Sequence, residues 1–163
     1  MTFEATFASA LSFIAMSILL VIYGTLDVKH REVSNKYMFT GIVASMIIVI
    51  ATGRLFEQPL LHITAILVMI LLSFALYRLG AIGGADIKSL LIIGVLSPGI
   101  EFAVWEDTIL EGILVSGLEI ILMLTLGILY WQLQGSNRPE KNVVPLIPFL
   151  LLAYLGVQLI AFL

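Results

Sequence analysis

The sequence predicts an all-α membrane protein, a polytopic bundle of about six transmembrane helices that forms a single domain over residues 1–163. Two observations predict this class, the composition and the spacing of apolar segments. Hydrophobic residues make up 61% of the chain and charged residues only 12%, and the mean hydropathy is +1.14. Soluble domains carry about 25% charged residues, and a soluble fold could not remove this much apolar surface from water. The bilayer is therefore the expected solvent.

Six apolar segments approach the length of about 20 residues that a helix needs to cross the hydrocarbon. They cover residues 8–27, 37–52, 60–79, 87–105, 109–133 and 143–162. The first lacks a basic leader and a small-residue cleavage site, so we expect a permanent span rather than a removed signal. In the fourth, the run from Ile87 to Leu96 meets residues 97–99, Ser-Pro-Gly, which should kink or end a helix. We expect residues 102–105 to complete this crossing, although Glu101 lies beside them.

The basic residues predict the orientation. If every segment crosses, the connections at 27–36, 78–88 and 134–142 lie on one side of the membrane. They contain seven of the eight Lys and Arg residues, namely Lys29, Arg31, Lys36, Arg78, Lys88, Arg138 and Lys141, and only Arg54 lies on the other side. The positive-inside rule then places these loops in the cytoplasm and both termini outside (N-out/C-out), in a multi-pass protein of the cell membrane.

The net charge and the cysteine and histidine content limit which partners and cofactors we expect. The net charge of −3 argues against a nucleic-acid partner. The chain has no cysteine, which excludes disulfides and thiolate metal sites. His30 and His62 stand apart without metal-ligand spacing. We therefore expect no metal site and no cofactor, and membrane lipid as the surroundings.

Two aspartates stand at the edges of apolar segments, where an ionisable group needs an explanation. Asp27 follows the apolar run that ends at Leu26, and Asp86 follows the glycine-rich stretch 80–85. The first segment descends to Asp27 and the fourth rises from Asp86, so both carboxyl groups should lie at similar depth on the cytoplasmic side. Taken singly, Asp86 could be a helix cap and Asp27 a plain interfacial residue. Their matched depth and the glycine-rich approach favour a functional pair.

Such a pair could hydrolyse an amide. Two carboxyl groups a few Å apart do not both ionise easily, so they share a proton. The ionised member can take a proton from water while the protonated member polarises a peptide carbonyl.

Two stretches around these residues match the motifs of one family. The stretch Asp27-Val28-Lys29-His30-Arg31-Glu32-Val33-Ser34-Asn35 is similar to D-x-x-x-R-x-[IV]-P-N, with serine where proline is usual, and Gly83-Gly84-Ala85-Asp86-Ile87-Lys88 is similar to G-x-[GA]-D-x-K. The sequence thus resembles the type IV prepilin peptidases, which are six-span membrane aspartyl peptidases of the GxGD type, and within them the archaeal preflagellin and prepilin branch. The resemblance covers nearly the whole chain.

The resemblance implies that Asp27 and Asp86 are catalytic. It also implies supporting or substrate-binding roles for Gly83, Gly84, Ala85, Lys88, Arg31 and Asn35. Small residues beside an aspartate let a substrate backbone approach closely. Lys88 has an equally ordinary interpretation as a lysine that reaches the interface, and Arg31 and Asn35 as a positive-inside anchor and a helix cap.

The implied activity is that of an aspartic-type endopeptidase that removes class III signal peptides at the cytoplasmic face of the membrane. The substrates would be preflagellins of the archaellum or prepilins of the type IV pilus, and the sequence leaves the choice between them open. Bacterial relatives often add a cysteine-ligated zinc segment and methylate the product. No such segment or cysteine is found here, so we expect no methyltransferase activity.

One alternative comes from a different functional class. A small proton- or cation-coupled membrane transporter subunit could also use paired acids, although such sites favour the membrane midplane. Glu119 lies near the middle of the fifth segment and should be neutral or paired there. Pro145 and Pro148 begin the sixth segment, where proline is at home in a first turn. By analogy with presenilin-type proteases, this segment could instead line the cleft.

Overall fold

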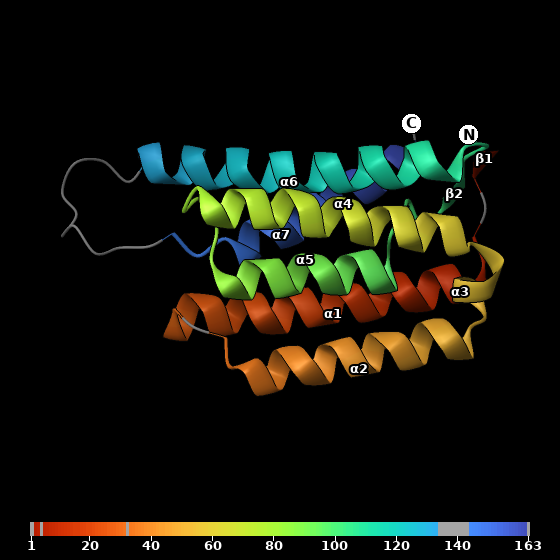
Figure 1. The fold of residues 1–163 in the computed structure, drawn as a ribbon, viewed down its shortest axis with the longest axis horizontal. Coiled ribbons are helices and arrows are strands. Elements are labelled where there is room, and N and C mark those ends of the chain that lie inside the picture. The colour runs from red at the N-terminus through yellow and green to blue at the C-terminus, as the bar shows by residue number, and fades with distance from the viewer. Residues whose placement is uncertain (1, 4, 32, 134–143, 163) are drawn as a thin grey trace.

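The computed structural model describes residues 2–3, 5–31, 33–133 and 144–162. Six main helices lie side by side in one bundle (Figure 1). They are α1 (Phe7–His30), α2 (Asn35–Ala51), α4 (Pro59–Arg78), α5 (Gly84–Leu96), α6 (Thr108–Leu133) and α7 (Ile147–Gln158). The short helix α3 (Arg54–Glu57) joins α2 to α4, and a 3-10 turn, η1 (Leu159–Phe162), extends α7. The predicted all-α membrane bundle is confirmed, apart from one pair of two-residue strands.

Three of these helices, α1, α4 and α6, are both long and apolar enough to cross a membrane. The helix α2 and residues 147–161 are apolar but shorter. A count of six crossings and the orientation of the termini stay predictions. Arg138 and Lys141, which contribute to the predicted orientation, lie outside the described residues.

The fourth apolar segment differs from its predicted bounds. Helix α5 ends at Leu96, and Ser97 makes the last helical hydrogen bond, from its N–H to the carbonyl of Ile93 at 2.8 Å. Pro98 follows and has no N–H with which to continue the helix. Instead of completing a helix, residues 103–104 form β2 (Ala103–Val104), which pairs antiparallel with β1 (Thr2–Phe3). The expectation that residues 102–105 finish a helical crossing is therefore wrong.

Because the chain after α5 folds back in this way, Glu101 is buried. Its Oε2 lies 2.5 Å from Nη1 of Arg54, and its side chain is fully buried. Its backbone N–H donates to Oε1 of Gln158 at 2.8 Å. The segment after α5 is thus tied to α3 and α7 at the end of the bundle that carries both strands, which we call the far end.

The helices pack in an order that differs from their order in the chain. Extensive contacts join α2 to α5, α5 to α4, α4 to α6, α6 to α7, and α7 to α1. The ring closes weakly, because α1 touches α5 and α2 at only a few points. The core inside this ring includes fully buried side chains from α1, α5 and α7, among them Met16, Leu90 and Leu150.

Candidate active site

A cavity of about 820 Å³ opens at the end of the bundle opposite the strands, which we call the pocket end. Here α1 and α6 end and α2, α5 and α7 begin. All eight residues singled out from the sequence line this cavity: Asp27, Arg31, Asn35, Gly83, Gly84, Ala85, Asp86 and Lys88. The fold therefore gathers two motifs that lie far apart in the chain around one space.

Asp27 lies in the last turn of α1 and is 9% exposed. Its Oδ2 accepts a hydrogen bond of 3.3 Å from the backbone N–H of Ile147, at the start of α7. Arg31 ends α1 in the left-handed conformation, at φ 56°, and its N–H donates to the carbonyl of Asp27 at 2.9 Å. The turn at Arg31 keeps the positive charge of its side chain near the Asp27 carboxyl group.

Asp86 occupies the third position of α5, and Gly83 rather than Asp86 is the N-cap. The Asp86 Oδ2 accepts a hydrogen bond of 2.7 Å from the N–H of Gly83, which satisfies one donor of the helix start. Asp86 therefore caps the start of α5, although from its third position and not as the N-cap itself. This hydrogen bond does not exclude a catalytic role for the same side chain. The carboxyl group still faces the cavity, and Asp86 is 8% exposed.

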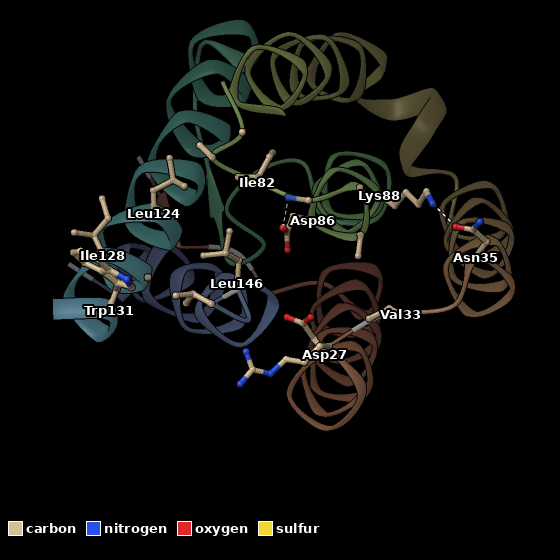
Figure 2. A pocket seen from close by; sticks show the side chains of 18 residues that line it. Asp27, Val33, Asn35, Ile82, Asp86, Lys88, Leu124, Ile128, Trp131 and Leu146 are labelled. Atoms are coloured by element: carbon tan, nitrogen blue, oxygen red, sulfur yellow. Dashed lines mark hydrogen bonds between the residues drawn. The ribbon is translucent and has the colours of Figure 1, made fainter. Parts of the chain in front are cut away.

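The two carboxyl groups project from α1 and α5 into the same space (Figure 2). Asp86 precedes the apolar run of α5 and so lies outside its membrane-crossing part. Burial raises the pKa of Asp86 from 3.8 to about 6, the hydrogen bond from Gly83 opposes this shift, and the negative charge of Asp27 adds to it. Asp86 is thus suited to be the member of the pair that holds a proton.

The glycine-rich stretch leaves backbone open beside Asp86. A Cβ added at Gly84 would meet no heavy atom within 4 Å. A Cβ at Gly83 would lie 3.3 Å from the Asp86 Oδ2 and would press on that carboxyl group. Gly80, at φ 72°, makes the left-handed turn that ends α4 and leads into this stretch. Small residues here serve both the turn and access to the aspartate.

A side-chain contact joins the two motifs directly. The Nζ of Lys88 donates to Oδ1 of Asn35, across from α5 to α2 (Figure 2). Lys88 is therefore occupied within the protein and does not simply extend toward the interface.

One wall of the cavity was not foreseen. Leu124, Ile128 and Trp131 of α6 line it, together with Leu146 (Figure 2). Gly127 makes room for this arrangement, since a Cβ there would lie 2.7 Å from Cδ2 of Leu146. The spacing of the α6 residues places them on one helix face, but in an apolar helix this pattern looks the same as a lipid-facing stripe.

The segment that begins α7 lines the cavity, as the analogy with presenilin-type proteases indicated. Val144 and Leu146 line the cavity, and Ile147 supplies the N–H that bonds Asp27. Glu119, by contrast, is fully buried within α6 and does not line the cavity. Neither of its oxygens has a hydrogen-bond partner among the described residues.

Comparison with known proteins gives one family. The chain matches the model of the type IV leader peptidase family over residues 14–162, which include both aspartates and every cavity-lining residue named above. No curated protein and no solved structure matches the chain. A match over almost the whole length shows the family, and its members are aspartic-type enzymes that cleave prepilin-type leader peptides. The chain belongs to the type IV leader peptidase family.

Proposed function

We propose that Asp27 and Asp86 are the catalytic pair with which this leader peptidase cleaves class III signal peptides at the cytoplasmic face of the cell membrane. One observation carries the proposal. Two buried carboxyl groups from different helices face a single cavity, and one of them is poised to retain a proton. Paired carboxyl groups in different electrostatic settings are the arrangement that metal-independent amide hydrolysis needs.

The two aspartates have different roles in this reaction. Asp27, in its ionised form, accepts a proton from a water molecule as the water oxygen bonds to the scissile carbonyl carbon. Asp86, which is protonated, donates a hydrogen bond to the carbonyl oxygen and stabilises the negative charge that develops there. The C–N bond then breaks, and the leaving amine takes a proton from the pair. Each carboxyl group ends the cycle ready to exchange protons with water.

The cavity walls suit a peptide whose leader meets an apolar helix. Gly83 and Gly84 offer open backbone to an extended segment, and Leu124, Ile128 and Trp131 offer an apolar wall to the helix that follows it. The natural substrate is then a preflagellin or a type IV prepilin. We expect hydrolysis alone, with the new N-terminal amine left unmethylated, which mass spectrometry of the product can check.

The charge distribution supports the cytoplasmic side for the cavity. Of the six Lys and Arg residues within the described ranges, five belong to the pocket end: Lys29, Arg31, Lys36, Arg78 and Lys88. Arg54 lies at the far end, where it pairs with Glu101. The positive-inside rule relates the basic end of such a bundle to the cytoplasm.

Cleavage of a tagged prepilin by the detergent-purified protein tests the proposal. Asp27→Asn and Asp86→Asn each keep the shape of the side chain and remove its acid–base function. Each should lower kcat by about 10²- to 10⁴-fold, the usual contribution of a general acid or base. Glu119→Gln is the matched control, because it replaces a buried carboxyl group away from the cavity and should leave cleavage intact. Proton flux into liposomes without any cleavage would instead support the transporter.

A further inference from the structure

The weak closure of the helix ring raises the question of what holds the aspartates together. Asp27 is carried by α1, which packs mainly on α7, and Asp86 is carried by α5, which packs on α4 and α2. Direct contact between α1 and α5 is sparse. The separation of the two carboxyl groups therefore depends on whatever links α1 to α5 near the pocket end.

The start of α2 makes one such link, to α1. Tyr23 precedes Asp27 by one helical turn on the same face of α1, and it is 2% exposed. Its hydroxyl donates a 3.0 Å hydrogen bond to the carbonyl of Tyr37 in α2. Gly41 leaves room for this hydroxyl, since a Cβ at Gly41 would overlap it. The same hypothetical Cβ would lie 3.3 Å from Cδ1 of Ile92, so α1, α2 and α5 meet at this glycine.

A second link joins the same part of α2 to α5. Asn35 accepts the hydrogen bond from Lys88, which lies two residues after Asp86. One residue further along α5, the Ser89 hydroxyl contacts the sulfur of Met38 at 3.9 Å, and both side chains are buried. The first two turns of α2 thus contact the helix of each aspartate, within about one turn of the aspartate itself.

We propose that residues 35–41 of α2 act as a clasp that sets the spacing of Asp27 and Asp86, with Tyr23 and Gly41 as positioning residues for the catalytic pair. The inference rests on the proposed function, since it assigns these residues a purpose in bringing the two carboxyl groups together. The simpler interpretation is that the Tyr23 hydrogen bond only stabilises the fold. The two interpretations predict different effects on the chemical step.

Tyr23→Phe is the first test, because it removes one hydroxyl and keeps the ring. The Tyr37 carbonyl keeps a donor in the Thr40 hydroxyl, at 2.8 Å, so no buried acceptor is left bare. Tyr154→Phe is the matched control. It removes a buried hydroxyl that bonds Ser97 at 3.0 Å, where α5 ends and away from the cavity.

The clasp predicts that Tyr23→Phe lowers kcat by about 10-fold or more with KM unchanged, since misplacement of catalytic groups by about 1 Å can cost 10²-fold. Tyr154→Phe should shift the thermal unfolding midpoint by about as much as Tyr23→Phe does, but it should leave kcat unchanged. The pH profile adds a readout that stability does not move. Carboxyl groups that lie further apart interact less, so the two limbs of the kcat/KM profile should approach each other in Tyr23→Phe alone. Arg31 and Lys88, the other charged residues that line the cavity, are unchanged in both variants.

A second variant tests the same clasp from the side of α2. Gly41→Ala should push the Tyr23 ring away and lower kcat further than Tyr23→Phe does. Adding Tyr23→Phe to Gly41→Ala removes the overlapping hydroxyl, although the ring carbon Cζ would still lie 3.0 Å from the new methyl. The double variant should therefore recover part of the kcat that Gly41→Ala loses. If Gly41→Ala does not fold, the comparison of the two Tyr→Phe variants decides alone.

The outcomes separate this inference from the function on which it rests. If Asp27→Asn and Asp86→Asn abolish cleavage while Tyr23→Phe behaves like Tyr154→Phe, the clasp is wrong and the catalytic pair stands. An equal fall of kcat in both Tyr→Phe variants, or an unchanged pH profile in Tyr23→Phe, would likewise overturn the clasp. If the Asn variants still cleave, the proposed function itself fails.

Discussion

Burial of Asp86 should lower the free energy of unfolding above about pH 6, where its carboxyl group ionises inside the fold. The pKa of this carboxyl group is about 6 in the folded protein, against 3.8 for an exposed aspartate. A difference of about 2 pKa units corresponds to about 3 kcal/mol, at 1.36 kcal/mol per unit. The pKa of Asp86 is higher in the folded protein than in the unfolded chain. Its contribution to the free energy of unfolding is therefore highest below about pH 4, and this contribution is lost as the pH rises to about 6.

Asp86→Asn removes this penalty and keeps an oxygen that can accept the hydrogen bond from Gly83. At pH 8 the variant should therefore be more stable than the unsubstituted protein by up to about 3 kcal/mol. Near pH 4 the two proteins should be almost equally stable, since the carboxyl group is then mostly protonated in the fold. Thermal unfolding of both proteins in the same detergent, at both pH values, measures the difference. A variant less stable than the unsubstituted protein at pH 8 would refute the reasoning.

Three further predictions concern the cavity wall and the far end. Gly84→Val should keep the fold but raise KM for a prepilin, because its side chain enters open space in the cavity; cleavage assays that show an unchanged KM would argue against substrate contact there. Trp131→Ala should also raise KM, by about 10-fold, with little change in the unfolding midpoint, because Trp131 is 60% exposed; a large loss of stability would show a structural role instead. Arg54→Met should destabilise the protein by about 3–5 kcal/mol, since it leaves the Glu101 carboxylate buried without its partner. Adding Glu101→Gln should restore much of that loss in thermal unfolding, and no recovery would mean that the ion pair is not the cause.

The sequence was enough to predict the membrane bundle and eight of the residues that line the cavity. Composition alone indicates the bilayer, and the apolar segments match the helices closely except where Pro98 ends α5 early. Asp27 and Asp86 could be placed together because each marks the same edge of an apolar segment. That inference needs only the alternation of crossings, and the structure indeed brings both residues to one cavity.

Contacts set by three-dimensional packing could not be predicted in this way. The Ile147 N–H that bonds Asp27 is a backbone group, which no side-chain pattern reveals. The fit of Tyr23 over Gly41 depends on two helices that touch at only a few points. The burial of Glu101 could not be predicted either, because it requires the chain after α5 to fold back onto α3 and α7. These features depend on which helices become neighbours, and hydropathy leaves that open.

The paired carboxyl groups are tested most directly by single-turnover cleavage of a purified prepilin with Asp27→Asn, Asp86→Asn and Glu119→Gln side by side. Loss of cleavage in both aspartate variants, in protein that remains folded, together with full activity of Glu119→Gln, is the result we predict. Cleavage at an undiminished rate by either aspartate variant would contradict the shared role of the pair.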